Sequence, residues 1–412
     1  MRDKINIKTI SVFFIWLLLF CNPPFSFYLI QGFPYLILKL ISIVALSILL
    51  IVNDKFRLSY TNKVMLFFIF INILYYFFTM YYHSDNTAIS QIIPLFVIVL
   101  VYLVITKICG FEMFAKSYVL LIIIIGLSGV LAFFLGLIGK LPILGYIGNE
   151  EIHSINYLFT FSNAVFNRDG DFQLIRVAGY FDEPGTFAFY ITFGLLINQL
   201  IFKNAKYEKL LILSGIFTLS LAFYIALFFQ LLFYKNWLKQ YLRLFVIVGS
   251  ILVLFNSLKN SVPIIGFLSL ATVDRFDKSD DGTIKGDNRS IYFEKGFVFF
   301  GEKPLLGHGK EEVLTNARFL GYDPSSFVGF LVFYGIIGTI IIFSFYLYQF
   351  TYLFNVRKEL VIDVFILKII FIEALLYIQR PLINVPLAII LLILMVELMN
   401  LRKNKLKDLV YE

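Results

Sequence analysis

The sequence predicts an all-α, polytopic integral membrane protein with about twelve transmembrane helices, and three observations support this fold class. The chain has 412 residues, 60% of them hydrophobic and 15% charged, and its mean hydropathy is +0.86. Water-soluble domains of ordinary composition are far less apolar. Several apolar runs approach the roughly 20 residues that a spanning helix needs. Lys and Arg residues gather in alternate loops between these runs, as orientation signals do.

The expected spans follow eleven apolar runs, which together form a single bundle over residues 1–412. The first run follows three cations and resembles a signal peptide, but no small-residue cleavage site follows it, so we expect a retained helix. The runs cover approximately Ile10 to Phe20, Tyr35 to Val52, Val64 to Tyr82, Ile92 to Thr106, Tyr118 to Ile138, Thr186 to Phe202, Leu210 to Tyr234, Leu244 to Phe255, Phe327 to Phe354, Val361 to Ile378 and Leu382 to Met399.

The loop charges predict that both termini are cytoplasmic. Arg2, Lys4 and Lys8 precede the first run, whereas residues 21–34 after it contain no Lys or Arg. The count meets a conflict at the run from Leu210 to Tyr234, because lysines flank both of its ends. One span cannot begin and end on the same side of a membrane. We therefore expect a broken hairpin of two short helices that bends near Thr218-Leu219-Ser220.

Two structured external loops are expected, at residues 139–179 and 258–325. In the second loop, Asn288 is expected to cap a helix that begins at Arg289. This helix has one apolar side, which suits a helix lying at the membrane interface. The sequence P-L-L-G-H-G from Pro304 to Gly309 then predicts a turn.

Charged residues stand directly before a span in the stretch from Arg176 to Gly185, which reads R-V-A-G-Y-F-D-E-P-G. The simplest interpretation is a helix start, with Asp182 as the N-cap and Glu183 in the first turn. Charges at a membrane boundary must also be solvated, paired or engaged with a polar ligand. The stretch is therefore a candidate functional site as well as a helix start.

The external face collects the candidate site residues, which are Arg176, Asp182, Glu183, Arg289, His308 and Arg380. Arginines from distant parts of the chain suit a polyanion such as a lipid diphosphate, because a guanidinium group matches phosphate oxygens bidentately. Snorkelling to the interface is the alternative for Arg380. His83 and Asp85 are interpreted as loop residues without a special role.

The sequence predicts no metal site, no cofactor and no nucleic-acid partner. Cys21 and Cys109 show no CxxC spacing, and the three histidines are scattered. No P-loop, Rossmann glycine pattern, HExxH or GxSxG occurs, which argues against nucleotide-dependent enzymes and against serine or zinc hydrolases. The net charge of +8 is spread over short loops rather than clustered on one soluble face.

Several motifs follow one another between about residues 170 and 400. They are R-V-A-G-Y-F-D-E-P-G, the broken hairpin around Leu219-Ser220, N-R-S-I-Y-F-E-K-G-F with K-P-L-L-G-H-G, S-S-F-V-G-F-L-V-F-Y-G-I-I-G, and Q-R-P. Their order resembles the O-antigen and capsular polysaccharide polymerases, the Wzy-type branch of the superfamily that also contains the O-antigen ligases. Relatives often have Arg where this chain has Leu221. They also have a His-Asn pair, more familiar from ligases, where this chain has Ser325-Ser326. The second departure favours a polymerase and leaves the general base unassigned.

The resemblance implies a metal-independent glycosyltransferase of the bacterial inner (plasma) membrane. Such an enzyme moves a growing glycan from undecaprenyl diphosphate to a sugar hydroxyl of a lipid-linked repeat unit. Arg176, Arg289 and Arg380 would then bind the diphosphate. Glu183 or His308 would orient or deprotonate the hydroxyl. The implied partners are the undecaprenyl-diphosphate-linked oligosaccharide, membrane lipid, a chain-length regulator and a flippase.

Three alternatives remain open at this stage. A ligase would move the finished glycan to a lipid A core or to a protein. A flippase or transporter for lipid-linked glycans would need cations within several spans that face a central cavity. A membrane scaffold in a glycan assembly complex would need no site of its own.

Overall fold

The structure is a computed structural model that describes residues 2–23, 25, 33–53, 60–137, 143–149, 152–157, 162–167, 173–181, 183–232, 257, 289–320, 327–359, 364–379, 382 and 384–411. Helices make up most of this part of the chain, which confirms a mainly helical protein. The chain divides into two compact units. The first unit comprises Met1–Tyr118, Arg289–Ile366 and Tyr377–Glu412, and the second comprises Val119–Asn288 and Leu367–Leu376.

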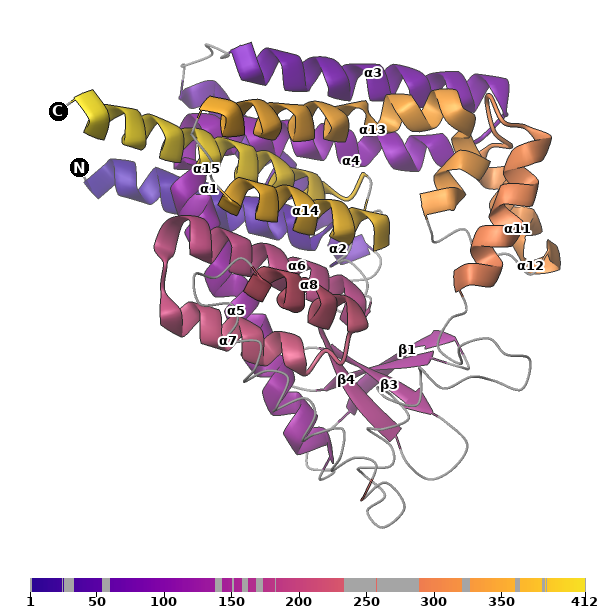
Figure 1. Cartoon of the computed structure of the whole chain (residues 1–412), viewed down its shortest axis with the longest axis horizontal. Coiled ribbons are helices and arrows are strands. Elements are labelled where there is room, and N and C mark those ends of the chain that lie inside the picture. Colours follow the sequence, from indigo (N-terminus) through magenta and orange to yellow (C-terminus); the bar gives the residue numbers. More distant parts are fainter. Residues whose placement is uncertain are drawn as a thin grey trace. The chain divides into compact units, whose positions relative to one another are not determined.

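The first unit consists of long helices from both ends of the chain. The helices α3, α4 and α13 lie side by side in Figure 1, and α11 and α12 lie at one end of them. The bounds are α1 Arg2–Phe20, α2 Phe33–Val52, α3 Tyr60–Tyr82, α4 Thr87–Val104 with the π-helical turn Ile105–Cys109, α11 Arg289–Glu302, α12 Lys310–Leu320, α13 Phe327–Glu359 and α15 Pro386–Tyr411. Two further helices, α5 Phe111–Leu137 and α14 Val364–Gln379, contribute residues to both units.

The second unit combines a small sheet with short helices. Its four strands are antiparallel in the order β1-β2-β3-β4, so each strand pairs with the next one along the chain. The strands are β1 Ile143–Asn149, β2 Ile152–Tyr157, β3 Ser162–Asn167 and β4 Gln173–Gly179, and the helices are α6 Pro184–Ile197 with the π-helical turn Asn198–Phe202, α7 Ala205–Ile216 and α8 Leu221–Leu232. The sheet gives the predicted external loop 139–179 its structure, and the sequence analysis did not predict it.

Ten of the eleven apolar runs coincide with helices, and Leu244 to Phe255 lies outside the described residues. Among the described residues, five helices are long and apolar enough to cross a membrane, at Pro34–Val52, Thr87–Cys109, Phe111–Leu135, Pro184–Phe202 and Phe327–Tyr352. Shorter apolar helices are Ile7–Phe20, Leu66–Tyr82, Leu221–Gln230 and Pro386–Leu401. A helical membrane protein is therefore supported, while the total of about twelve spans and their orientation stay predictions.

The broken hairpin is confirmed as a structural element. Helix α7 ends at Ile216 and α8 begins at Leu221, with a turn between them in which Leu219 has a left-handed φ of 48°. Each helix has 12 residues, which gives a length of about 18 Å and is less than the roughly 30 Å of a bilayer core. The two helices approach closely at Gly215, where an added Cβ would lie 2.0 Å from the Phe223 ring.

Two predicted helix starts have different outcomes. Helix α11 begins at Arg289, as predicted. The N-cap of α6 is Glu183 rather than Asp182, with Pro184 in the first helical turn. Asp182 itself lies outside the described residues. The Glu183 side chain makes no capping hydrogen bond, so the extended backbone before Pro184 starts this helix without a side-chain cap.

Candidate functional site

A break in α13 lies where the chain segment Pro304–Gly309 crosses it. Gly335 has φ 62° and ψ −170°, which interrupts the helix and separates backbone N–H and C=O groups from their usual partners. The N–H groups of His308 and Gly309 donate to the carbonyls of Val332 and Phe333, at 2.9 Å each. In return, the N–H groups after Gly335 donate to the crossing segment, Ile336 to Pro304 at 2.8 Å and Ile337 to Leu305 at 3.2 Å. The break is therefore satisfied internally, as an interrupted membrane helix requires.

Glycines permit this close crossing. A Cβ on Gly335 would lie 2.3 Å from the carbonyl carbon and oxygen of Leu305, and a Cβ on Gly307 would lie 2.5 Å from those of Phe333. Both residues also have positive φ values, 62° and 73°, that disfavour a side chain. The turn predicted at Pro304–Gly309 is confirmed, and its backbone is fixed against α13.

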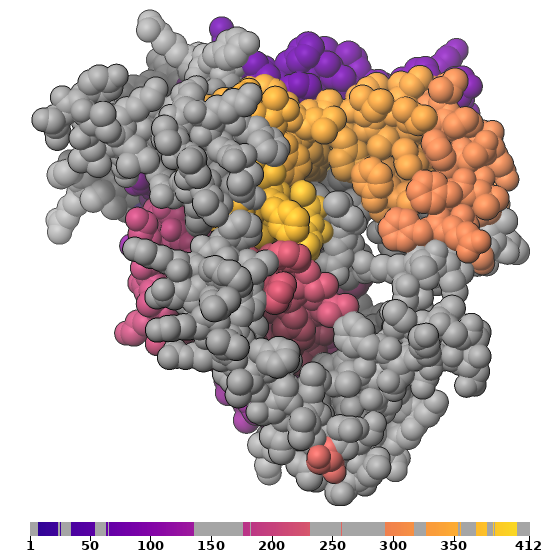
Figure 2. Space-filling view, viewed as in Figure 1, coloured from indigo at the N-terminus to yellow at the C-terminus, as the bar shows by residue number. Residues whose placement is uncertain are grey.

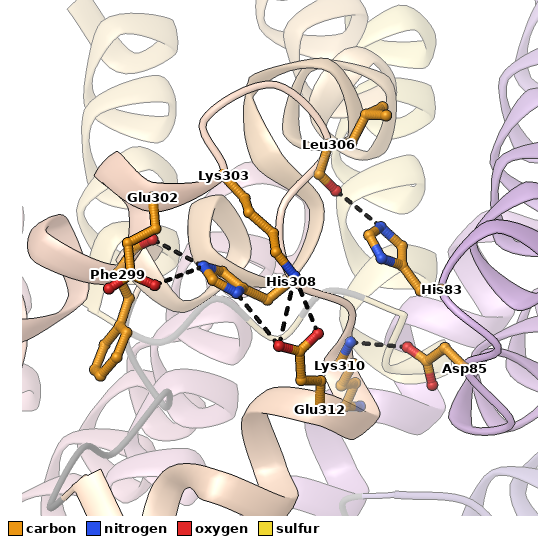
Figure 3. A network of polar contacts seen from close by, with 9 residues as sticks. All are labelled: His83, Asp85, Phe299, Glu302, Lys303, Leu306, His308, Lys310 and Glu312. Atoms are coloured by element: carbon orange, nitrogen blue, oxygen red, sulfur yellow. Dashed lines mark hydrogen bonds and ion pairs between the residues drawn. The ribbon is translucent and has the colours of Figure 1, made fainter.

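Asp85 caps two helices at once, which corrects its interpretation as an ordinary loop charge. Its side chain is buried, with 1% of the residue exposed. One carboxylate oxygen accepts from the backbone N–H of Thr87 at 2.9 Å, at the start of α4. The other accepts from the N–H of Lys310 at 2.8 Å, at the start of α12 (Figure 3). The negative charge also suits two helix N-termini, where unpaired N–H groups carry partial positive charge.

His83 makes a second link between the same segments, and it is not a solvated loop residue. Its Nε2 lies 3.1 Å from the carbonyl oxygen of Leu306, so this nitrogen donates a hydrogen bond. Burial lowers the pKa of His83 from its ordinary value, and the nearby Lys303 acts in the same direction. Together with Asp85, this contact ties the α3–α4 turn to the α11–α12 turn.

His308 lies in the centre of this junction with a defined tautomer. Its side chain is 9% exposed, and its Nε2 lies 2.9 Å from the carbonyl oxygen of Phe299. Because a carbonyl can only accept, Nε2 carries the proton. In the neutral imidazole, Nδ1 is then the basic nitrogen. Figure 3 shows the ring held between Phe299 on α11 and Glu312 on α12.

The surroundings of His308 are acidic. Glu312 Oε1 lies 3.6 Å from Nδ1, and Glu302 Oε2 lies 3.8 Å from Nε2. Lys303 forms an ion pair with Glu312 at 3.3 Å, which offsets one of the two carboxylates. Both carboxylates are about half exposed, and α11 and α12 form part of the outer surface in Figure 2. Chemically, this arrangement can accept a proton and stabilise the resulting imidazolium, but it repels a free anion.

In the second unit, Arg176 binds the turn of the broken hairpin. Its Nε donates to the carbonyl of Thr218 at 3.1 Å, and its Nη2 donates to that of Leu219 at 3.0 Å. The neighbouring Val177 N–H donates to Phe217 at 3.1 Å, so strand β4 pairs with the turn. Arg176 is 9% exposed. Arg176 therefore makes a structural contact that the sequence analysis did not predict. Backbone carbonyls in a turn need hydrogen-bond donors, and the guanidinium group supplies them to two carbonyls of this turn.

The other predicted site residues are described to different extents. Glu183 is exposed at the N-cap of α6 in the second unit. Arg289 is the first residue of α11, and its side chain lies outside the described part of the structure. Arg380 lies outside the described residues altogether. Of the predicted residues, the structure thus defines the side-chain contacts of Arg176 and His308.

One buried cation within an apolar run is paired. Lys368 on α14 is 3% exposed and donates to Oε1 of Gln199. Gln199 in turn donates to Glu208 at 2.9 Å. This chain satisfies the ammonium group inside the second unit. Within the described residues, no group of three or more His, Cys, Asp or Glu side chains is arranged to hold a metal ion.

No protein-family model matches this chain, and no curated protein matches it.

Proposed function

We propose that this protein is a polysaccharide polymerase that transfers a glycan from undecaprenyl diphosphate to a sugar hydroxyl of a lipid-linked repeat unit. The motif resemblance names the reaction, and His308 is the observation that supports it best. Its Nε2–H donates to Phe299, so Nδ1 is the available base. The turn that carries it is fixed by four backbone hydrogen bonds to α13. A general base needs this combination of a set tautomer and a rigid position.

In the proposed reaction, the acceptor hydroxyl gives its proton to Nδ1 of His308. The hydroxyl oxygen forms a bond to the anomeric carbon of the donor glycan, and the bond from that carbon to the diphosphate oxygen breaks. The diphosphate leaves with the bonding electrons. Glu302 and Glu312 stabilise the imidazolium that forms, since both carboxylates lie within 4 Å of the ring.

The diphosphate of the glycan donor and the hydroxyl of the glycan acceptor are assigned to different residues on the basis of charge. The two carboxylates beside His308 disfavour a diphosphate there, so His308 is assigned to the acceptor hydroxyl. Arg176, Arg289 and Arg380 are assigned to the diphosphate, whose charge grows as it leaves. Glu183 is the second candidate for orienting the hydroxyl. The site acts at the external face of the bacterial inner membrane, with both chain termini in the cytoplasm.

Substitution of His308 by Gln tests the proposed base. A Gln amide keeps a donor for the Phe299 carbonyl and removes the basic nitrogen. Chain extension should fall by about 10²- to 10⁴-fold, the contribution of general base catalysis, while the protein stays in the membrane. The matched control is Thr315→Ala on α12, because Thr315 is exposed and its hydroxyl donates only to its own helix, at Glu311. Polymer of normal length in the His308→Gln strain would refute the role of His308.

A deletion strain tests the reaction itself. A single repeat unit on the acceptor indicates a lost polymerase. Accumulated lipid-linked polymer indicates a ligase, and repeat units trapped inside the cell indicate a flippase. Arg289→Ala and Arg380→Ala should each abolish chain extension without loss of the protein from the membrane. Normal extension in both would remove these arginines from the diphosphate site.

A further inference from the structure

The outward side of α11 is apolar. Phe297 and Val298 are 55% and 64% exposed, and Gly301 follows on the same side, with nothing within 4 Å of its Cβ position. Residues three and four apart share one face of a helix, so these three positions form one surface. The exposed charges Glu294 and Glu302 bound this surface at its two ends. An exposed apolar surface on a protein marks contact with a membrane or with another molecule.

The adjoining surface of α13 is apolar as well. Ile336, Ile337 and Ile340 are exposed and follow the break at Gly335. They belong to Phe327–Tyr352, one of the helices that are long and apolar enough to cross a membrane. An exposed apolar face on such a helix contacts the acyl chains of the lipid.

Leu305 connects the two surfaces. Its side chain is exposed in the turn that follows α11. Its carbonyl accepts from the N–H of Ile337 at 3.2 Å, and the carbonyl of Pro304 accepts from the N–H of Ile336 at 2.8 Å. The turn is therefore fixed beside the exposed isoleucines of α13. In Figure 2, the atoms of α11 and α12 adjoin those of α13. The apolar surface of a membrane span thus continues onto α11.

Charged side chains lie at the C-terminal end of α11. Glu302, Lys303 and Glu312 are about half exposed, and Lys303 pairs with Glu312 at 3.3 Å. Exposed charges require water or lipid headgroups, whereas Phe297 and Val298 favour an apolar phase. A helix that combines both surfaces beside the end of a membrane span suits the plane of the membrane interface.

We propose that α11 lies in the membrane interface, with Phe297, Val298 and Leu305 inserted among the acyl chains and with Glu302 at the headgroups. The partner is the lipid bilayer, because the inserted surface continues from that of a membrane span. The sequence predicts only that this helix is interfacial, whereas the exposed side chains identify the side that inserts and join it to Leu305 and α13.

The position of α11 has a consequence for His308. Its ring is held by the carbonyl of Phe299, which directly follows the inserted Val298. His308 therefore lies at the depth of the lipid headgroups, where a lipid-linked molecule reaches it by lateral diffusion. The membrane contact of α11 does not depend on the proposed reaction, and it remains if His308 has another role.

Spin labels on introduced cysteines test the proposal in the full-length protein, in vesicles of phosphatidylethanolamine and phosphatidylglycerol. Oxygen concentrates among the acyl chains, whereas a nickel chelate stays in water. The ratio of oxygen to nickel accessibility at Phe297→Cys and Val298→Cys should match that of Ile340→Cys on α13. It should be several-fold higher than at Thr315→Cys, the control on α12, because Thr315 is exposed and its hydroxyl bonds within its own helix. Cys21 and Cys109 are buried, and the unsubstituted protein provides the blank.

The outcomes separate lipid from other occupants of this surface. A ratio at 297 and 298 as low as at 315 would place the surface in water and overturn the proposal. Low accessibility to both reagents would indicate a protein contact, such as a second copy of this chain, and would overturn it too. Gly301→Cys provides the same measurement if Phe297→Cys does not fold, because its Cβ position is open. The pattern should persist in His308→Gln, so the result is separate from that of the chain-extension assay.

Discussion

Replacement of Asp85 by Ala should destabilise the first unit more than a single surface change would. The buried carboxylate accepts from the N-termini of both α4 and α12, at 2.9 and 2.8 Å. Loss of one N-cap costs about 1 kcal/mol, so the loss of two costs at least about 2 kcal/mol. The N–H of Lys310 also becomes a buried donor without its acceptor, which adds to this value. For a unit of this size, we expect the melting temperature to fall by about 4–8 °C.

The two cysteines of the chain provide the assay. Cys21 and Cys109 are both buried and both lie in the first unit. A thiol-reactive fluorophore therefore reports the unfolding of this unit as temperature rises. Asn86→Ala is the matched control, because Asn86 occupies the N-cap position of α4 but its side chain makes no capping bond. If Asp85→Ala melts within the small shift of Asn86→Ala, the double-cap reasoning is wrong.

Three further predictions concern the same elements. Gly335→Ala should destabilise the first unit by about 1–3 kcal/mol, because its Cβ would lie 2.3 Å from the Leu305 carbonyl. Gly301→Ala should be neutral, because its Cβ would meet nothing within 4 Å. Equal melting curves for the two variants would contradict this. Burial lowers the pKa of His83 in the folded state below its ordinary value of 6.5, which applies in the unfolded state. As pH falls below 6.5, the unfolded state therefore takes up a proton that the folded state does not yet bind, and the free energy of unfolding decreases. The melting temperature should therefore fall between about pH 7 and pH 5, with a shallower slope in His83→Gln, and an unchanged slope would exclude His83 as the cause. Arg176→Lys should increase proteolytic cleavage at the α7–α8 turn relative to Lys206→Arg, because lysine cannot bridge the Thr218 and Leu219 carbonyls as the guanidinium does; identical cleavage would exclude this role.

Residue patterns within short stretches of the sequence were sufficient to predict the elements that those stretches form. The broken hairpin was predicted because lysines flank both ends of one apolar run, and the turn lies at the expected residues. The start of α11 and the Pro304–Gly309 turn were also predicted correctly. The N-cap of α6 was misplaced by one residue, since either of two neighbouring carboxylates fits a capping pattern.

Long-range pairing could not be predicted in this way. Asp85 and Lys310 are 225 positions apart, and nothing near Asp85 in the sequence indicates a second helix N-terminus. The break in α13 was missed because a single glycine in an apolar run is usually tolerated within a helix. The four-stranded sheet was missed because its strands are short and rich in Gly, Asn and Ser, and their pairing depends on one another.

Where Pro304–Gly309 crosses the break in α13, the glycines and the histidine of the motif K-P-L-L-G-H-G are under different structural constraints. Gly307 is required by backbone geometry, since its φ is 73° and its Cβ position is occupied by Phe333. His308 stands between Gly307 and Gly309, and its side chain takes no part in the backbone hydrogen bonds that hold the crossing in place. A distant protein that shares the glycines but not the histidine would therefore share the interrupted helix without the imidazole. The glycines specify the backbone of the crossing, and the histidine between them can vary independently of it.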